Sequence, residues 1–312
     1  MNVFLWHVHG SWTTAFVHGG HRYFVPVLPD RGPEGRGRAD TFAWPANVFE
    51  VSPEEASTLP IDVVLLQRPE ELHLWAEKWL GQRRPGRDVP ALYVEHNAPQ
   101  GRINDMRHPA ADRPELIVVH VTHFNDLFWD CGTTPTRVIE HGIVDPGLQY
   151  SGELPRIGVV INEPLRRHRV TGTDLLPRFD AVAPVDLFGM QVAPLGGYEN
   201  LPQSRMHQEL ARRRVYVHPM RWTSLGLSLL EAMQLGMPVV ALAATEAVEA
   251  VPKDAGVVST QVDVLVEAVR RLVCAPDEAR SMGQRAREFA LARYGLGRFL
   301  AEWDQVLGEV AR

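Results

Sequence analysis

The chain has 312 residues, of which 45% are hydrophobic and 22% charged, and its formal net charge is -6 at pH 7. This length fits roughly two domains, and the composition is that of an ordinary globular protein. The negative charge excludes a whole-molecule attraction for nucleic acid. Two cysteines that lie far apart in the sequence exclude a disulfide framework.

The first half of the chain alternates short apolar runs with helical patterns. Expected strands lie at residues 3–8, 23–28, 63–66, 91–94, 116–121 and 137–139, and expected helices at 69–80 and 125–131. The opening residues lack a basic region, which favours a buried strand over a signal peptide. No run approaches the ~18 apolar residues that span a bilayer, so we expect a cytoplasmic protein, with peripheral contact at the inner membrane face left open.

A glycine- and proline-rich segment at residues 142–155 is the expected linker. Strands are then expected at 157–161, 185–188, 215–218, 239–242 and 256–258, and helices at 173–179, 204–213, 227–235, 262–274, 277–293 and 297–310. Strands that alternate with helices predict parallel sheets. We therefore expect an α/β protein of two Rossmann-like, doubly wound domains, residues 1–148 and 149–295. Residues 296–312 are expected to cross back to the first domain, and ligands to bind at strand carboxyl ends, in a cleft between the domains.

The most informative stretch, residues 218–233, predicts a strand, a tight polar turn and a helix. Such a turn exposes backbone N–H groups at a helix N-terminus, where an anion is favoured. Gly226 has no Cβ, so a bulky ligand can approach the backbone there. Glu231 lies among apolar residues and on the same helix face as Ser224. The pattern leaves two roles open for Glu231: binding the hydroxyl pair of a ribose, or lying on a polar stripe or beside an arginine.

This stretch resembles the retaining glycosyltransferases of family four, whose signature is two glutamates separated by seven residues. The matching segments here are Ser224-Leu225-Gly226-Leu227 and Leu229-Leu230-Glu231-Ala232-Met233, with further similarity at 137–145, 201–219 and 235–240. The resemblance implies the GT-B fold and a bacterial group-1-type enzyme. Such an enzyme moves a hexose from a nucleotide-diphosphate sugar to an acceptor hydroxyl, with retention of the anomeric configuration.

The resemblance also implies a donor site, with Glu231 on the nucleotide ribose. Its expected residues are Arg221, Thr223, Ser224, Leu225, Gly226, Leu227 and Glu231. Thr223 stands where the family has its first glutamate, and Leu225 where it has phenylalanine, so recognition of the donor sugar is expected to differ.

The family neutralises the departing diphosphate with basic residues, and Thr171 occupies the expected place of its lysine. Arg166 and Arg169 are the expected substitutes, because a guanidinium suits bidentate contact with phosphate. The alternative is a solvated basic loop.

Two segments of the first domain are expected to line the acceptor side. His9, Gly10 and Ser11 follow the first strand and are the expected acceptor-binding residues, although a histidine at a strand end is often structural. His96 ends the strand at 91–94. The resemblance implies that His96 contacts the donor or the transition state rather than acting as a general base.

The thirteen histidines show no metal-binding spacing, and the resemblance implies metal-independent catalysis with no cofactor besides the nucleotide-sugar co-substrate. The expected partners are that sugar and a carbohydrate, lipid-linked or natural-product acceptor, with no nucleic acid. Two alternatives remain. Thr223 and Thr171 favour a non-catalytic relative that acts as a binding or partner subunit, while a sugar-nucleotide epimerase needs acid–base residues around the sugar.

Overall fold

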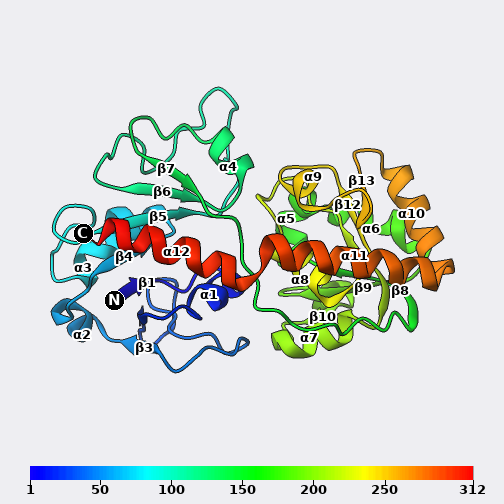
Figure 1. Ribbon diagram of the computed structural model, residues 1–312, viewed down its shortest axis with the longest axis horizontal. Coiled ribbons are helices and arrows are strands. Elements are labelled where there is room, and N and C mark those ends of the chain that lie inside the picture. The colour runs from blue at the N-terminus through cyan, green and yellow to red at the C-terminus, as the bar shows by residue number, and fades with distance from the viewer. Residues whose placement is uncertain (312) are drawn as a thin grey trace. The chain divides into compact units, whose positions relative to one another are not determined.

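The computed structural model describes residues 1–311. The chain forms two compact units: unit 1 consists of Met1–Gly142 together with the segment from Leu296 onward, and unit 2 is Ile143–Gly295. Each unit is built on one parallel β-sheet with helices packed on it (Figure 1). Within residues 1–311, no helix is long and apolar enough to cross a membrane.

Unit 1 has a seven-stranded sheet in the order β3-β2-β1-β4-β5-β6-β7, in which all neighbours pair in parallel. Its strands are β1 Asn2–Leu5, β2 Arg22–Pro26, β3 Val48–Val51, β4 Val63–Leu66, β5 Ala91–Glu95, β6 Ile117–His120 and β7 Thr136–Val138. Its helices are α1 Gly10–Phe16, α2 Pro53–Thr58, the π-helix η1 Glu71–Trp75, α3 Ala76–Trp79, α4 His123–Phe128 and α12 Leu296–Val310. The strand order reverses between β1 and β4, which is where such sheets bind ligands, beyond the strand carboxyl ends.

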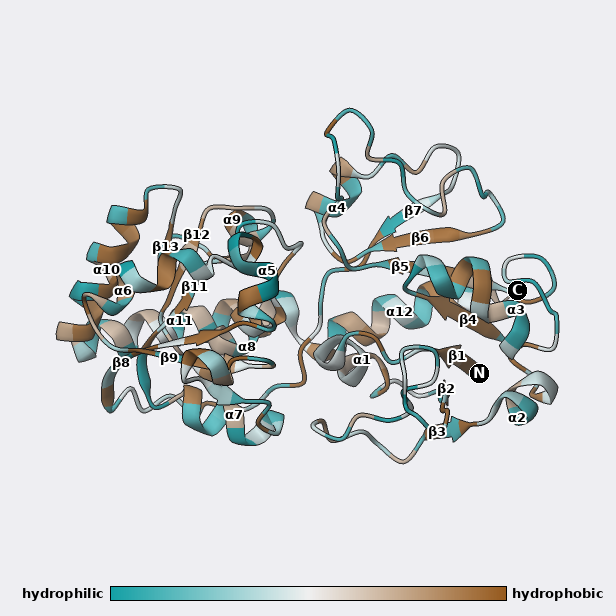
Figure 2. Cartoon of the chain, turned by 180° about the vertical axis from the view of Figure 1, so that it is seen from behind, coloured by the Kyte–Doolittle hydropathy of each residue, from teal (hydrophilic) through white to brown (hydrophobic). Residues whose placement is uncertain are grey.

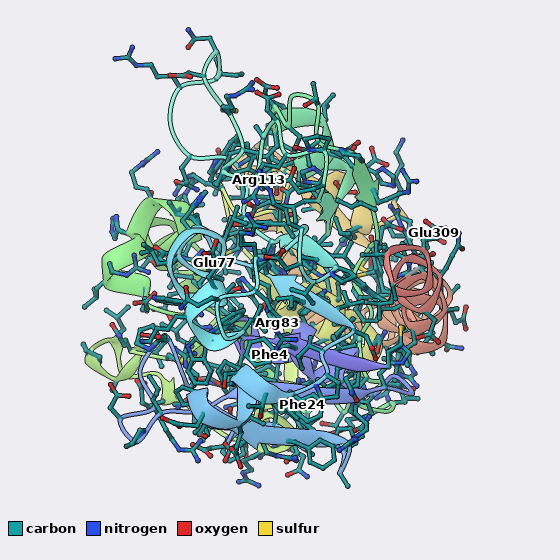
Figure 3. All side chains as sticks on the ribbon, turned by 90° about the vertical axis from the view of Figure 1, so that its left-hand side faces the viewer. Phe4, Phe24, Glu77, Arg83, Arg113 and Glu309 are labelled. Carbon is teal, nitrogen blue, oxygen red and sulfur yellow. The ribbon has the colours of Figure 1, made fainter. Side chains whose placement is uncertain are left out.

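The central strands of unit 1 are hydrophobic along their length (Figure 2), as expected of parallel strands covered on both faces. All four residues of β4 are buried. Phe4 and Phe24 lie on the sheet, whereas the exposed Glu309 of α12 projects from the surface (Figure 3).

The last helix, α12, completes the core of unit 1. The Trp303 ring lies 5.7 Å from that of Trp12 and 5.1 Å from that of Phe16, both on α1. Arg298 donates hydrogen bonds to the carbonyl oxygens of Glu140 and His141, at 3.0 and 2.7 Å. Helix α12 is thus packed on α1 by aromatic side chains and fixed to the end of the first segment by a guanidinium.

Unit 2 has a six-stranded parallel sheet in the order β10-β9-β8-β11-β12-β13. Its strands are β8 Leu154–Val160, β9 Val185–Gly189, β10 Tyr198–Glu199, β11 Arg213–His218, β12 Val239–Leu242 and β13 Gly256–Ser259. Its helices are α5 Pro164–Thr171, η2 Thr173–Leu175, α6 Leu176–Asp180, η3 Ala193–Leu195, α7 Gln203–Leu210, α8 Leu227–Leu235, α9 Ala247–Ala250, α10 Val262–Cys274 and α11 Pro276–Tyr294. Val215 and Val217 of β11 pack on one face of the sheet and Tyr216 on the other, as the period of a strand requires.

The first segment of unit 1 ends at Gly142, so most of the expected linker, residues 142–155, lies in unit 2. Ile143 pairs with Gly295, and Tyr150 packs in the core that α8 and α11 share. Residues 143–150 therefore belong to unit 2, where Ile143 and Tyr150 are buried.

Candidate functional site

The turn between β11 and α8 brings most of the expected donor-site residues together in unit 2. Strand β11 ends at His218 and α8 begins at Leu227, with Gly226 as its N-cap in an extended conformation. A Cβ built on Gly226 lies 2.3 Å from Cε1 of His218. Burial lowers the pKa of His218 to about 4, so the ring is neutral near pH 7. The packing of this ring accounts for a glycine at 226.

The N-terminus of α8 presents unused hydrogen-bond donors. The first bond that closes the helix runs from Leu229 N to Gly226 O, at 2.9 Å. No described residue accepts a hydrogen bond from the backbone N–H groups of Gly226, Leu227 and Ser228. Three adjacent free N–H groups at a helix N-terminus favour an anion through both hydrogen bonds and the helix dipole.

Arg221 fixes this turn to the end of α5. Its two Nη atoms lie 2.6 and 2.8 Å from the Asp174 carboxylate oxygens, and Nη1 also donates to Arg169 O at 2.9 Å. The Arg221 backbone N–H donates to Val170 O at 2.8 Å. The guanidinium holds the pKa of Asp174 below its ordinary value. Arg221, expected to bind the donor, thus also positions the turn.

A glycine makes the contact between α5 and this turn possible. Gly172 caps α5 with a left-handed φ of 71°, and a Cβ there lies 2.0 Å from Pro219 O. The preceding Thr171 is fully buried, and its hydroxyl pairs with Thr173 Oγ1 at 3.0 Å. Thr171 therefore supplies no cation and takes part in packing instead.

The three arginines of α5 differ in their surroundings. The Arg166 side chain is 67% exposed and pairs with Glu163, while that of Arg169 is 74% exposed and lies 3.3 Å from Asp174. Arg167 is half-buried, and its guanidinium makes no hydrogen bond or ion pair within the described part of the chain. Burial, with Arg166 nearby, lowers the Arg167 pKa. An arginine nevertheless stays charged, and a charge removed from water favours a bound anion.

Arg167 was not predicted as a site residue, although it lies between Arg166 and Arg169, which were. Helix α5 was not predicted, and it contains a non-helical residue, His168, with a φ of 20°. The run Arg166-Arg167-His168-Arg169 carries no signal that tells its buried member from its exposed ones.

Glu231 is buried at the interface between α8 and α7. Only 2% of Glu231 is exposed, so it does not lie on a polar surface stripe. Gln203 Nε2 donates to Glu231 Oε1 at 2.9 Å, and His207 Nε2 lies 3.3 Å from Oε2. Both partners come from α7, which therefore orients the carboxylate.

The remaining residues of the turn differ in burial. Ser224 and Leu225 are buried, and Leu225 packs in the core of unit 2. Thr223 and Leu227 are half-buried. Thr223 and Leu227 thus keep partly open side chains, whereas Ser224 and Leu225 do not.

The expected acceptor residues lie at the end of β1 in unit 1. His9 is the N-cap of α1, which Gly10 and Ser11 open. A Cβ on Gly10 lies 2.3 Å from Cε2 of Phe42. The space left by this glycine is therefore filled by an aromatic ring of the loop after β2.

His96, directly after β5, belongs to the same edge of the unit 1 sheet. Its ring lies 4.1 Å from that of His9 and 4.9 Å from that of Trp12, and its Nε2 lies 3.0 Å from Gln67 Oε1. A third histidine, His141, is buried, and burial lowers its pKa to about 3. Gln67 was not predicted as a site residue, because no motif surrounds it.

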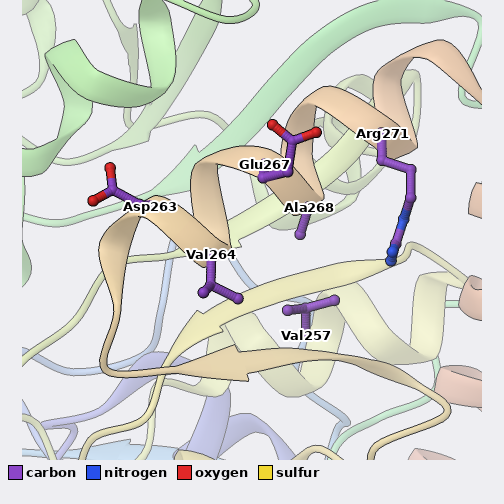
Figure 4. A pocket seen from close by; sticks show the side chains of 6 residues that line it. All are labelled: Val257, Asp263, Val264, Glu267, Ala268 and Arg271. Atoms are coloured by element: carbon purple, nitrogen blue, oxygen red, sulfur yellow. The ribbon is translucent and has the colours of Figure 1, made fainter.

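A separate hollow on unit 2 has a cavity volume of about 530 Å³ and opens between β13 and α10 (Figure 4). Its lining residues are Val257, Asp263, Val264, Glu267, Ala268 and Arg271. None of them belongs to the turn, α5 or α8, so the hollow contributes nothing to the candidate site. Over residues 1–311 no group of three or more His, Cys, Asp or Glu side chains is placed to hold a metal ion.

Part of the second unit matches a known sequence family. Residues 197–289 match the model of "Glycosyl transferases group 1", a segment that contains α7, β11, the turn and α8. The predicted resemblance to group 1 glycosyltransferases is confirmed over this segment. No curated protein sequence matches the chain significantly.

Several solved structures have the same fold. Sucrose-phosphate synthase from Thermosynechococcus elongatus is 14% identical, with 99% of this chain and 98% of that chain covered and a TM-score of 0.71. HepE from Anabaena in complex with UDP-glucose is 14% identical, with 99% and 100% covered and a TM-score of 0.68. A glycosyltransferase from Rickettsia africae is 11% identical, with 100% and 98% covered and a TM-score of 0.64. At such identities the likeness concerns the fold, and the predicted GT-B architecture is confirmed.

Proposed function

Since this chain combines the GT-B fold with the group 1 glycosyltransferase pattern at residues 197–289, we propose that it transfers a hexose from a UDP-hexose to an acceptor hydroxyl, with retention. The observation that carries the proposal is the set of free N–H groups of Gly226, Leu227 and Ser228 at the start of α8. The choice of UDP rests on HepE, a protein of the same fold that binds UDP and UDP-glucose.

In this proposal the diphosphate lies at the N-terminus of α8. The N–H groups bind its oxygens, and Arg167 of α5 supplies the positive charge that Thr171 lacks. Glu231 accepts hydrogen bonds from the ribose hydroxyls, in an orientation set by Gln203 of α7. Thr223 contacts the donor sugar through one hydroxyl instead of a carboxylate.

The chemistry exchanges one C–O bond for another on the same face of the sugar. The bond from the anomeric carbon to the β-phosphate oxygen breaks, and its electron pair stays on that oxygen. The acceptor oxygen bonds to the anomeric carbon, and its proton passes to the departing phosphate. Negative charge grows on the phosphate during this step, so fixed N–H groups and a guanidinium stabilise the transition state more than the bound substrate.

Binding of nucleotide diphosphates tests the donor site. At 100 times its dissociation constant, UDP is expected to stabilise the wild-type protein by about 2.7 kcal/mol, visible as a rise in thermal midpoint. Glu231→Ala is expected to lose this rise, because the ribose then has no acceptor at α8. Thermal-shift titration with UDP, GDP, dTDP and ADP makes the measurement.

The matched control is Glu267→Ala, which removes a carboxylate of α10 that is 66% exposed. It is expected to respond to UDP as the wild type does. If none of the four nucleotides shifts the wild-type midpoint, the donor site is absent and the proposal fails.

A second candidate function is the binding of a nucleotide sugar without catalysis. It is favoured by the neutral Thr223 and by the buried Thr171. Release of UDP from UDP-glucose separates the two. Turnover, with acceptor or with water, supports the transferase, whereas tight binding of UDP-glucose without any turnover supports the binding protein.

A further inference from the structure

The His96 side chain has one ring nitrogen occupied and one free. Nε2 lies 3.0 Å from Gln67 Oε1, while no described residue forms a hydrogen bond with Nδ1. Only 8% of His96 is exposed, and the rings of His9 and Trp12 pack against it. The ring orientation is therefore fixed from three sides, by Gln67, His9 and Trp12.

The orientation of the Gln67 amide follows from its other partner. Gln67 Nε2 lies 2.7 Å from Trp6 O, and a backbone carbonyl only accepts hydrogen bonds. The atom facing Trp6 is therefore the NH₂ group, and the atom facing His96 is the carbonyl oxygen. This oxygen accepts, so His96 Nε2 must carry the hydrogen.

Gln67 is itself held in place by the buried carboxylate of Glu71, which pairs with Arg68. Its backbone N–H donates to Glu71 Oε2 at 2.6 Å, and Arg68 Nε lies 2.6 Å from Glu71 Oε1. Both Gln67 and Glu71 are almost fully buried, at 1% and 0% exposure. The side-chain amide of Gln67 is thus bonded at both its nitrogen and its oxygen, and the backbone that carries it is also held, which fixes the orientation of the amide.

The charge state of His96 follows from its neighbours. Burial, with His9 and His141 nearby, lowers its pKa well below the ordinary value, so the ring is neutral at pH 7. A neutral imidazole with hydrogen on Nε2 has only a lone pair on Nδ1. The free edge of His96 can therefore accept a hydrogen bond but cannot donate one.

We infer that Gln67 is a positioning residue that holds His96 as its Nε2–H tautomer, so that Nδ1 accepts a hydrogen bond from a sugar hydroxyl. The inference rests on the proposed function and deepens it. A phosphate oxygen, which accepts only, is disfavoured at Nδ1. The hydroxyl belongs either to the donor sugar or to the acceptor, and the experiment separates these sources.

The first measurement is the tautomer itself, by long-range ¹H–¹⁵N NMR of protein labelled at histidine, with the His96 signals assigned from His96→Asn. Wild type at pH 7 is expected to show His96 as the Nε2–H tautomer. Gln67→Met keeps the side-chain length but removes both hydrogen bonds, and is expected to give a mixture of tautomers. An Nδ1–H tautomer or a protonated ring in the wild type overturns the inference.

Gln234→Met is the matched control, since Gln234 is a fully buried glutamine of α8 in unit 2. It makes the same substitution and carries a similar risk to folding, but is expected to leave the His96 signals unchanged.

Kinetics and binding give the functional readout. Gln67→Met is expected to lower kcat/KM for sugar transfer about tenfold, the value of one hydrogen bond, and to leave the Kd of UDP unchanged. A Kd for UDP-glucose raised about tenfold assigns the hydroxyl to the donor sugar, whereas an unchanged Kd with a raised acceptor KM assigns it to the acceptor. Unchanged kcat/KM overturns the inference. If the wild type does not bind UDP at all, the proposed function fails, while the NMR result still tests the tautomer.

Discussion

Replacing Arg167 by glutamine is expected to lower kcat for sugar transfer about 100- to 1,000-fold, the usual effect of removing one group that stabilises transition-state charge. Arg167 is the half-buried guanidinium of α5 without a protein partner, and the proposed diphosphate is the anion that balances it. Steady-state kinetics with UDP-glucose measures the change. The Kd of UDP is expected to rise less than kcat falls, because the leaving phosphate gains charge only as the bond breaks.

The adjacent Arg166 provides a close control for this substitution. Its side chain is 67% exposed and paired with Glu163. Arg166→Gln therefore removes the same charge from the same helix but keeps the guanidinium of Arg167. Its kcat is expected to stay within about twofold of wild type, since surface ion pairs contribute little. Equal losses in both variants would show that only the overall charge of α5 matters. A large loss in Arg169→Gln alone would move the role to Arg169.

Gly172→Ala is expected to reduce the free energy of unfolding by about 2–5 kcal/mol and to weaken UDP binding with it. A left-handed φ costs a residue with a Cβ about 1–2 kcal/mol, and overpacking adds about 1–3 kcal/mol. The overpacking arises because the new Cβ lies 2.0 Å from the carbonyl oxygen of Pro219. Pro219 is the first residue of the turn before α8. Chemical denaturation and thermal-shift titration with UDP measure the two effects.

Gly196→Ala separates strain from contact. Gly196 has a φ of 72°, against 71° for Gly172, but no atom lies within 4 Å of its added Cβ. Its expected cost is therefore the conformational one alone, about 1–2 kcal/mol, with normal affinity for UDP. Equal losses of stability and of UDP affinity in the two variants would contradict the role given to the Pro219 contact.

The sequence predicted the sheets well where a strand is an uninterrupted apolar run. The expected bounds of β4 and β12 agree with the structure at both ends, since Val63–Leu66 and Val239–Leu242 are short runs that are apolar throughout. Strand β3 was missed, because two of its four residues, Phe49 and Glu50, are not buried and the strand lies at the sheet edge. Edge strands of this length carry too weak an alternation to predict.

The sequence predicted the turn of the candidate site but not the surroundings of its side chains. The strand–turn–helix at 218–233 was predicted correctly, and α8 has its expected bounds, because a polar turn between apolar segments is a strong signal. The surroundings of the arginines in α5 were not predictable, since the burial of Arg167 depends on an irregular helix. Likewise, Gln67 meets His96 only through the pairing of β4 with β5, which joins residues far apart in the sequence.

Helix α12 belongs to unit 1 but is synthesised last. Unit 2 is continuous in sequence, whereas unit 1 needs residues from both ends of the chain. During synthesis from the N-terminus, Trp12 and Phe16 have no α12 to cover them until Trp303 has left the ribosome. Domains generally fold as units, so unit 2, though second in sequence, has all its residues first. A nascent chain stalled before residue 296 therefore displays an uncovered aromatic surface, which is the kind of surface that chaperones bind.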